Sequence, residues 1–356
     1  MSTTSRTIQY LSSGALWARL GNVELRVVAD NDEGILPLIE AESQVVSRFA
    51  QEAQWPHQTV TFFILTDLSA LQRQLQALGR SPVGAESDQV SDLLAHPVVN
   101  VYDLAAPAAC HVFVNRQAME AAGYWKDMQA MQGLLAHEHA HPLAECATTY
   151  AVRQLQLNAR LQLAQSWTTN IQKAKAWADR AQNQMNSLLR TLLLLGPREV
   201  FTNEMALATG FSEPLLHLNR QNVTNLIKGL AYRPTLQAQL ADAVRAGHLS
   251  AVGANALSLI GDLQGHLMLA MEVAAFQRQK EQAASEELLA QLHEEVFPAL
   301  HPVVEKLFTK LCEGYERLPK TASAQEMARF VQSQLVTIAT LLAQQSLRLT
   351  YQVTIA

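Results

Sequence analysis

The chain has 356 residues, of which 49% are hydrophobic and 17% are charged, and it carries a net charge of −5. This length is sufficient for two domains or for one large domain with a substantial core. The acidic balance excludes a general electrostatic attraction to nucleic acid or to an anionic membrane, so any such binding would have to be local.

The cysteines and the apolar runs predict a cytoplasmic protein without a membrane segment. Cys110, Cys146 and Cys312 lie far apart, are odd in number and form no C-x-x-C pair, which is typical of a reduced compartment. The N-terminal sequence contains no uninterrupted apolar segment of the kind that directs export. The most apolar later runs, LLRTLLLLG and LMLAMEVAAF, are too short to span a bilayer and are expected to be buried helix faces.

The first third of the chain mixes strand-like and helix-like periods. Alternating or compact apolar runs predict strands, amphipathic runs predict helices, and clusters of glycine, proline and polar residues predict loops. The predicted elements are strands at residues 22–30, 58–67 and 111–115, helices at 34–53, 68–78 and 124–141, and loops at 79–88 and 96–100.

From Leu143 onward the chain is expected to be almost entirely helical, because Gln, Ala and Leu dominate and Pro and Gly are sparse. Residues 143–167 and 169–196 could form one rod of roughly 75 Å, which is longer than a compact domain of this size allows. We therefore expect a hairpin that bends near residues 166–170. Further helices at 284–300 and 323–349 have broad apolar stripes that suit a bundle or a surface for a protein partner.

The helix at 124–141 carries the sequence HEHAH, in which His137, Glu138 and His141 have the H-E-x-x-H spacing. Residues four apart on a helix lie about 6 Å apart on one face, so the two imidazoles can point at a single ion. Zinc accepts neutral imidazole nitrogens and keeps one position for water in catalytic sites. Glu138 is rotated off the histidine pair and could act on that water as a general base. His139 faces away from the pair and is expected to be a supporting or exposed residue.

The stretch LLAHEHAH, preceded by HVFVN and TVTFFILTD, resembles the zincin metallopeptidases, especially the gluzincin or peptidase-MA-like group. The resemblance covers roughly residues 55–150. It implies an α+β catalytic part with a small mixed sheet and an active-site helix, followed by a mostly α-helical C-terminal region. It also implies that His137 and His141 bind Zn²⁺, and that a metal-activated water hydrolyses a peptide or protein substrate with Glu138 as the general base.

The same resemblance implies a third metal ligand from a later helix. Gluzincins use a glutamate that is frequently preceded by asparagine, and FTNEMALATGF offers Asn203-Glu204. We expect Glu204 to return to the metal through the hairpin, with Glu199 as a weaker candidate. The donor that stabilises the oxyanion is not identified by any motif. The candidates for it are Tyr150, His217 and Tyr232.

Glu145 is an alternative third ligand, because it stands four residues after His141. In a continuous helix it would lie about 9 Å along the axis from the midpoint of the histidine pair, too far to share the ion. Pro142 leaves this open, since proline disfavours a helical conformation at the residue before it and can break the helix there. Cys110 does not stand in a deformylase-like ligand motif, and we expect it to be buried.

A second resemblance concerns the segment EMALATGFSEPLLHLNRQNVTNLIKG, which is similar to the helix-turn-helix of AraC-type regulators. Ala206 stands four residues before Gly210, and a serine follows that could cap a reading helix. Possible phosphate contacts are Arg220, Lys228 and Arg233, although Glu204 and Glu213 weaken the case. With this module the chain would be a regulatory zincin-like protein that binds DNA; without it the segment is an ordinary helical hairpin.

A third alternative is a ferritin-like di-metal protein, because Glu138-x-x-His141 also has the spacing of di-iron helical bundles. Such a bundle needs a second E-x-x-H and two further carboxylates, and the nearest candidate spaces Glu213 and His217 by four.

The expected organisation has three parts: a zincin-like catalytic α+β region at 1–145, a helical region at 146–235 that completes the site, and an α-helical bundle extension at 236–356. A possible helix-turn-helix occupies 203–230.

Overall fold

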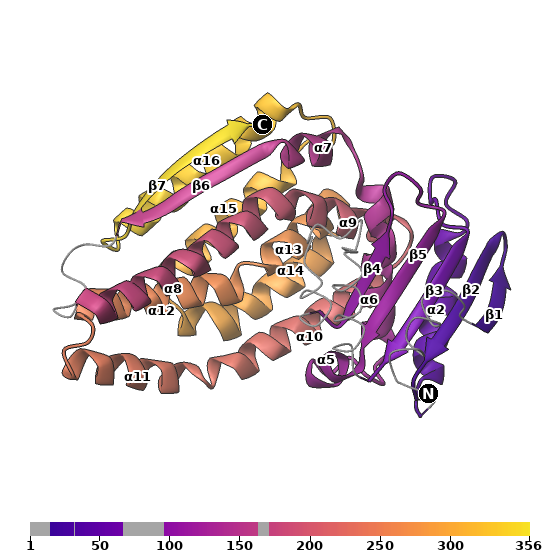
Figure 1. Cartoon of the computed structure of the whole chain (residues 1–356), viewed down its shortest axis with the longest axis horizontal. Coiled ribbons are helices and arrows are strands. Elements are labelled where there is room, and N and C mark those ends of the chain that lie inside the picture. The colour runs from indigo at the N-terminus through magenta and orange to yellow at the C-terminus, as the bar shows by residue number, and fades with distance from the viewer. Residues whose placement is uncertain (1–14, 32, 67–95, 163–170) are drawn as a thin grey trace. The chain divides into compact units, whose positions relative to one another are not determined.

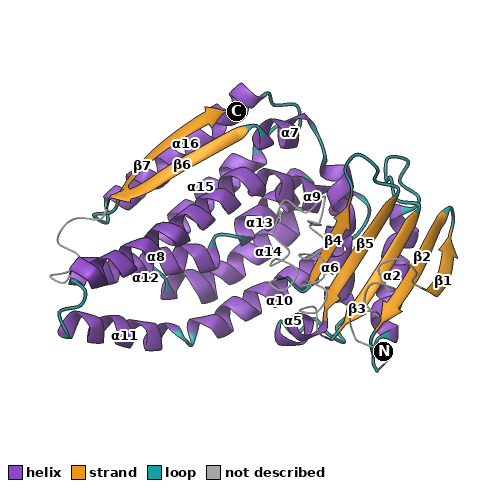
Figure 2. Ribbon diagram, in the orientation of Figure 1, coloured by secondary structure: helices purple, strands orange, loops and turns teal. Residues whose placement is uncertain are grey.

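The computed structural model describes residues 15–31, 33–66, 96–162 and 171–356, with 171–174 in backbone only (Figure 1). It is a mixed α+β protein, with a five-stranded sheet in the N-terminal part and mainly helices after it (Figure 2). The predicted fold class is confirmed at this level. The chain divides into two compact units, the sheet unit of Met1–Leu143 and Met205–Gln221 and the helical unit of Ala144–Glu204 and Asn222–Ala356.

The sheet has the strand order β1-β2-β3-β5-β4. Its strands are β1 (Ala15–Leu20), β2 (Val23–Ala29), β3 (Thr59–Leu65), β4 (Val98–Tyr102) and β5 (Ala109–Asn115). The three inner strands run parallel, whereas β1 is antiparallel to β2 and β4 is antiparallel to β5. The central strand β3 is almost completely buried, which explains its continuous apolar sequence TVTFFIL. The strands predicted at 22–30, 58–67 and 111–115 are confirmed by β2, β3 and β5.

The loop predicted at residues 96–100 is wrong, because Val98–Tyr102 forms the edge strand β4. Pro97 directly precedes the strand, and its carbonyl accepts a hydrogen bond from the Asn115 amide at 2.8 Å. Proline is tolerated at the start of an edge strand, since it lacks only an N–H that the ladder does not need there. The helix predicted at 68–78 and the loop at 79–88 lie outside the described residues.

Two helices of the sheet unit pack against each other: α2 (Leu36–Phe49) and α6 (Met128–Ala140). The short helix α5 (Arg116–Ala121) follows β5 directly. The N-terminal half of α10 (Ser212–Leu230) also belongs to this unit and approaches α6 closely at Gly133. A Cβ atom on Gly133 would lie 2.4 Å from the carbonyl oxygen of Pro214, so only glycine allows this approach.

The helical unit consists of a long series of helices and a two-stranded ribbon. Its elements are α7 (Ala147–Arg153), β6 (Leu155–Gln162), α8 (Ile171–Arg190), a π-helical turn (Thr191–Leu195), α9 (Gly196–Ala208), the second half of α10, α11 (Arg233–Arg245), α12 (Ala251–His266), α13 (Leu269–Arg278), α14 (Gln282–Gln291), a π turn (Leu292–Val296) with a 3-10 turn (Phe297–Ala299), α15 (Pro302–Glu316), α16 (Ala324–Ala343) and β7 (Arg348–Ile355). The helix predicted at 284–300 is confirmed by α14 and the turns that continue it.

The helix predicted at 143–167 is wrong over Leu155–Gln162, which forms the strand β6, and its end lies outside the described residues. The helix predicted at 323–349 ends at Ala343, and β7 begins at Arg348. These two strands pair with each other in an antiparallel ribbon. Leucine or alanine alternates with polar residues over Leu155–Gln162, a period of two, although Leu, Gln and Ala individually favour helices. The expected bend near residues 166–170 lies outside the described residues.

The core of the helical unit includes Tyr315 of α15, a large side chain that is completely buried. Its hydroxyl donates a hydrogen bond to the carbonyl of Leu192 in the π turn, and burial raises the pKa of this hydroxyl well above its ordinary value. A Cβ atom on Gly196 would meet the same hydroxyl oxygen at 2.5 Å, so the glycine gives it room. Within the described part of the chain, no helix is both long enough and apolar enough to cross a bilayer.

Candidate metal centre

The helix α6 carries the H-E-x-x-H residues in its last turn and immediately after it. It begins at Met128 and is capped by Asp127, whose carboxylate accepts a hydrogen bond from the amide of Ala130 at 3.1 Å. It ends at Ala140 and continues as a 3-10 turn at His141–Ala144, where Pro142 prevents a regular α-helix. His141 nevertheless keeps helical backbone angles, with φ −50° and ψ −44°. The proline therefore does not remove His141 from the face that it shares with His137.

His137, Glu138 and His141 form a group in which one ligand atom of each residue lies within 4.8 Å of the other two. The two imidazole rings have centroids 4.9 Å apart and are nearly perpendicular, at 84°. Tetrahedral zinc, with bonds of about 2.0–2.1 Å, needs its two nitrogens about 3.3 Å apart, which small ring rotations can reach. The side chains of His141 and Glu138 are 12% and 13% exposed, so solvent can approach. Two imidazoles beside a carboxylate are a donor set that suits zinc.

The carboxylate of Glu138 is held by the edge strand β4. The main-chain N–H of Asn100 donates to Glu138 Oε2 at 3.1 Å, and the same carboxylate oxygen lies 3.8 Å from His141 Nε2. The side-chain amide of Asn100 donates to the main-chain carbonyl of Glu138 at 3.1 Å. Asn100 is buried. Asn100 was not predicted as a site residue, because residues 96–100 were expected to form a loop; the polar residue inside the apolar run VVNVY was the available signal.

The outer edge of β4 presents main-chain groups beside Glu138. The hydrogen bond from the Asn115 amide to the Pro97 carbonyl shows which residues direct their main-chain N–H and C=O groups toward β5. These are Val99 and Val101, at every second position after Pro97. The N–H and C=O groups of Val98, Asn100 and Tyr102 therefore point to the opposite edge. This is the edge at which Asn100 meets Glu138.

His139 is fully buried and faces away from the histidine pair, as its position in the helix predicts. Its Nε2 lies 2.8 Å from Glu42 Oε1 of α2, and Trp55 Nε1 donates to its main-chain carbonyl at 3.0 Å. These contacts fix the last turn of α6 against its neighbours. Close by, burial and, to a smaller extent, the adjacent His139 outweigh a hydrogen bond to the Pro107 carbonyl and lower the pKa of His57 to about 4, so that His57 is neutral at physiological pH.

The three candidates for the third ligand belong to the helical unit, and Glu204 and Glu145 bind cationic side chains there. Glu204 Oε2 accepts from Arg278 Nε at 2.9 Å, and Lys320 Nζ lies 3.2 Å from Glu204 Oε1. Glu145 binds Arg153 through both carboxylate oxygens, at 2.7 and 2.8 Å, and also Arg198 at 3.1 Å. Glu199 lies in the first turn of α9. The assignment of Glu204 as a ligand stays a prediction.

The candidates for an oxyanion donor lie in different surroundings. His217 Nε2 is 2.7 Å from Asp127 Oδ2 at the start of α6, about 15 Å along the helix from His137, which argues against this role. Tyr150 is half exposed, with the guanidinium of Arg153 over its ring at 5.4 Å. Tyr232 is 77% exposed.

The two-helix motif predicted at 203–230 is present as α9, a turn and α10. Gly210 makes the turn with a φ of +94°, and a Cβ there would meet the guanidinium of Arg48, which donates to the Thr209 carbonyl at 2.8 Å. Leu215, Leu218 and Asn219 on α10 are buried, so this part of the helix packs inside the sheet unit and does not form an open reading face.

One of the predicted phosphate contacts is already engaged. Arg233 binds Asp262 through two hydrogen bonds, at 2.7 and 3.0 Å, and this pairing raises the pKa of the guanidinium.

The second ligand group of a di-metal bundle is also not seen, since the residues that the structure describes contain one such group, that of α6.

All three cysteines carry free thiols, and Cys110 and Cys312 are buried. The predicted burial of Cys110 is confirmed. Burial, with a smaller contribution from Glu42, raises the pKa of the Cys110 thiol well above its ordinary value. Its thiolate is therefore scarce at neutral pH, which argues against a role as a metal ligand.

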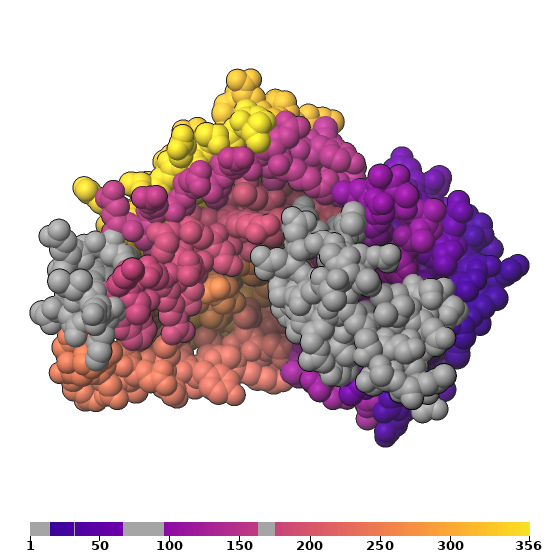
Figure 3. Space-filling view, viewed as in Figure 1, coloured from indigo at the N-terminus to yellow at the C-terminus, as the bar shows by residue number. Residues whose placement is uncertain are grey.

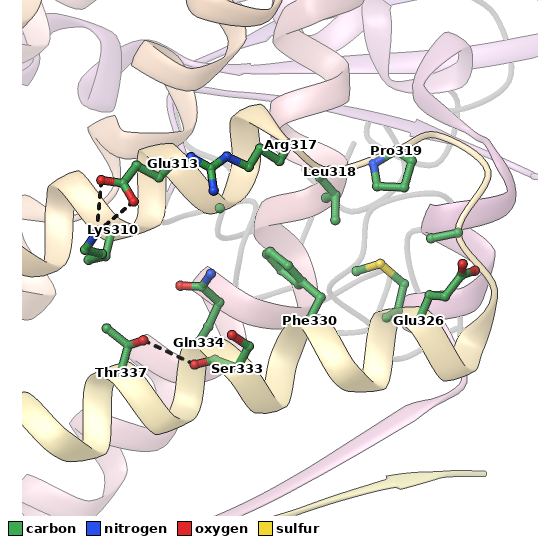
Figure 4. Close-up of a pocket in the computed structure, with 13 residues that line it drawn as sticks. Lys310, Glu313, Arg317, Leu318, Pro319, Glu326, Phe330, Ser333, Gln334 and Thr337 are labelled. Carbon is green, nitrogen blue, oxygen red and sulfur yellow. Dashed lines mark hydrogen bonds and ion pairs between the residues drawn. The ribbon is translucent and has the colours of Figure 1, made fainter.

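The helical unit has a pocket of its own between α15 and α16 (Figure 4). It has a volume of about 340 Å³ and an apolar part formed by Leu318, Met327 and Phe330. At one end the ammonium of Lys310 binds the carboxylate of Glu313 at 2.8 Å. Among the described residues, the pocket contains no group of metal ligands.

Comparisons with protein-family models, curated proteins and solved structures found no match to this chain. The resemblance to zincins therefore stays an expectation from the sequence.

Proposed function

We propose that the chain is a zinc-dependent metallopeptidase with a zincin-like site, located in the cytoplasm, in which His137 and His141 bind Zn²⁺ and Glu138 is the general base. One observation carries this proposal: the three side chains converge at the end of α6, directly beside the outer edge of β4. A metal group that lies next to a strand edge can act on an extended chain paired with that edge.

The residues of the chain have separable roles in this reaction. When bound, zinc would lower the pKa of water and polarise the scissile carbonyl. Glu138 takes the proton from the attacking water and delivers it to the leaving amine. Asn100 holds Glu138 from two sides, through the carboxylate and through the main-chain carbonyl, and so positions the base.

The substrate that suits this arrangement is a peptide in extended conformation. The main-chain groups of Val98 and Asn100 face the outer edge of β4, where a peptide would add as a further strand in place of the contacts that bury this edge. Its pairing with the Asn100 amide would release the Glu138 carboxylate from that bond and leave it available to water. Substrate binding and activation of the base would then be coupled.

Metal analysis and cleavage of a peptide mixture test the proposal together. We expect the purified protein to bind one equivalent of zinc and to cleave peptides, and Glu138→Gln to keep the metal but lose cleavage. His141→Ala should lose both, because one imidazole alone holds zinc weakly. His293→Ala is a matched control, since this histidine is half exposed and lies in the helical unit. Cleavage by Glu138→Gln at the wild-type rate, or failure of the wild type to bind zinc, would exclude the proposal.

A further inference from the structure

The strands β6 and β7 form an antiparallel ribbon whose two faces differ in chemistry. Eight residue pairs join them, from Leu155 opposite Ile355 to Gln162 opposite Arg348. The apolar residues of both strands share one face, on the side of α8 and α16. The opposite, outer face carries Gln156, Asn158, Arg160 and Gln162 from β6 and Arg348, Thr350, Gln352 and Thr354 from β7. All of these are exposed except Thr354, which is half-buried. The ribbon lies at the surface, with β6 in magenta and β7 in yellow (Figure 3).

The outer face contains no carboxylate, although the chain as a whole is acidic. The absence extends beyond the strands, since residues 146–178 and 327–356 contain neither Asp nor Glu but six Lys and Arg. At the average frequency of this chain, 32 acidic residues in 356, segments of this combined length would hold about six. An ordinary solvated face of an acidic protein has no reason to exclude one sign of charge. A polyanionic partner gives such a reason.

Arg160 and Arg348 are diagonal neighbours on this face, because Arg160 pairs with Thr350 and Arg348 is two residues before Thr350. Both are exposed, and neither has an ion-pair partner among the residues that the structure describes. Two adjacent guanidinium groups without a carboxylate repel each other, and an anion from outside the chain would relieve this repulsion.

The ribbon is held in place by α8, so its face is preorganised. Gln182 accepts from the Leu161 amide at 2.8 Å and donates to the Ala159 carbonyl at 3.0 Å, which satisfies the outer edge of β6 there. Polar groups on a rigid element bind with a smaller entropic cost than groups on a loop.

We infer that the outer face of the β6–β7 ribbon binds B-form duplex DNA in its major groove. This groove is about 12 Å wide and admits a two-stranded β-ribbon. Arginine recognises guanine, and asparagine and glutamine recognise adenine, through paired hydrogen bonds to the base edges. The face carries just these side-chain types, together with threonine. A ribbon of eight residues per strand extends about 26 Å, enough to follow roughly seven base pairs.

Duplex DNA suits the ribbon better than RNA, because the major groove of A-form RNA is too narrow and deep for side chains to read. Within this chain, the ribbon is also a better candidate than the helix-turn-helix segment. Leu215 and Leu218 are buried in the first half of α10, and Arg233 is bound to Asp262, whereas the polar side chains of the ribbon are open to solvent.

Binding of the full chain to a labelled duplex of about 20 base pairs, followed by fluorescence anisotropy over a range of salt concentrations, tests this inference. We expect Arg160→Ala/Arg348→Ala to lower the affinity at least tenfold and to weaken its salt dependence. Arg245→Ala/Arg317→Ala removes the same charge from exposed positions of the helical unit and should change the affinity less than twofold. Equal losses in the two double variants would overturn the inference, as would the absence of binding at low salt.

Recognition of the DNA base sequence by the ribbon is tested in a separate experiment. In a selection from random duplexes, Asn158→Ala/Gln352→Ala should flatten the preferred sequence while leaving the salt dependence unchanged. Tighter binding to single-stranded DNA or to duplex RNA than to duplex DNA would also overturn the inference. Metal-free protein is measured in parallel without any peptide, so the result is independent of the proposed peptidase activity.

Discussion

Asn100 clamps Glu138 through two hydrogen bonds of 3.1 Å, one from its main-chain N–H to the carboxylate and one from its side-chain amide to the carbonyl. The first bond aims the candidate base, and the second joins the last turn of α6 to the edge of the sheet. A single residue of β4 therefore connects the sheet to the candidate metal centre.

Asn100→Ala should separate these two functions. It removes the side-chain bond and leaves the partly buried carbonyl of Glu138 with one donor fewer, which should lower the free energy of unfolding by about 1–3 kcal/mol. The main-chain bond to the carboxylate survives, so zinc binding should persist, whereas kcat should fall because the last turn of α6 is held less firmly against β4. Urea unfolding, zinc titration and peptide cleavage measure the three quantities. Asn158→Ala, at an exposed position on β6, is the control and should change stability by less than about 0.5 kcal/mol.

Gly133→Ala should destabilise the sheet unit. The new Cβ would lie 2.4 Å from the Pro214 carbonyl oxygen, and because that atom is main chain, α6 and α10 must move apart. Overpacking of this kind costs about 1–3 kcal/mol.

Gly261→Ala, at a comparable helical position, should have the opposite effect on stability. A Cβ there meets nothing within 4 Å, so the higher helix propensity of alanine should stabilise α12 by about 0.5–1 kcal/mol. Thermal unfolding of both variants checks the pair. A higher midpoint for Gly133→Ala would show that the helices do not approach as described.

Asp127 should contribute a pH-dependent part of the stability. Partial burial acts to raise the pKa of Asp127, but hydrogen bonds from His217 and from the Ala130 amide outweigh it and hold the pKa below its ordinary value. A carboxyl whose pKa is lower in the folded state stabilises the fold above its unfolded pKa, about 3.9. This stabilisation is lost as the pH falls from there through the folded pKa.

Urea unfolding between about pH 5 and pH 2 measures this effect. The wild type should lose stability more steeply in this range than Asp127→Asn, which still caps the helix but cannot be ionised. Asp242→Asn, at an exposed position, should keep the wild-type slope. Identical slopes for the wild type and Asp127→Asn would refute the assigned contribution.

Glu204→Gln tests the predicted third ligand. If Glu204 completes the zinc site, we expect its zinc affinity, measured by competition with a chelator, to fall at least tenfold, by analogy with the loss of other metal-site groups. Glu145→Gln should leave the affinity unchanged. Both variants also replace a carboxylate that forms an ion pair with arginine. Both proteins should therefore lose stability, and this shared loss serves as an internal reference. Unchanged zinc affinity in Glu204→Gln would restrict this residue to its ion pairs with Arg278 and Lys320.

The sequence predicted those features that depend on near neighbours in the chain. The face shared by His137 and His141 follows from their spacing in a helix, and β3 follows from a continuous apolar run. The strand β4 was missed because it has only five residues and directly follows a proline. The Asn100–Glu138 contact was beyond prediction, since it requires the strand order that places β4 at the edge beside α6.

The strand β6 was misassigned for a related reason. Its leucine, glutamine and alanine residues favour a helix when neighbours alone are considered, and only pairing with a distant segment makes the extended form stable. No strand was predicted for that segment, β7, and the helix predicted at 323–349 overlaps only its first two residues. The contact of His139 with Glu42 is likewise non-local, because it depends on the packing of α2 against α6.

The pairing of β6 with β7 also determines when the helical unit can be completed during synthesis. Arg160 and its neighbour Thr350 are separated by 190 residues, so β6 leaves the ribosome roughly 10–40 s before its partner exists, at about 5–20 residues per second. For that interval the nascent chain carries an unpaired, leucine-rich strand, which is a hazard for aggregation. Gln182 of α8 forms hydrogen bonds with main-chain groups at one edge of β6. These bonds can form early, because α8 is translated soon after β6.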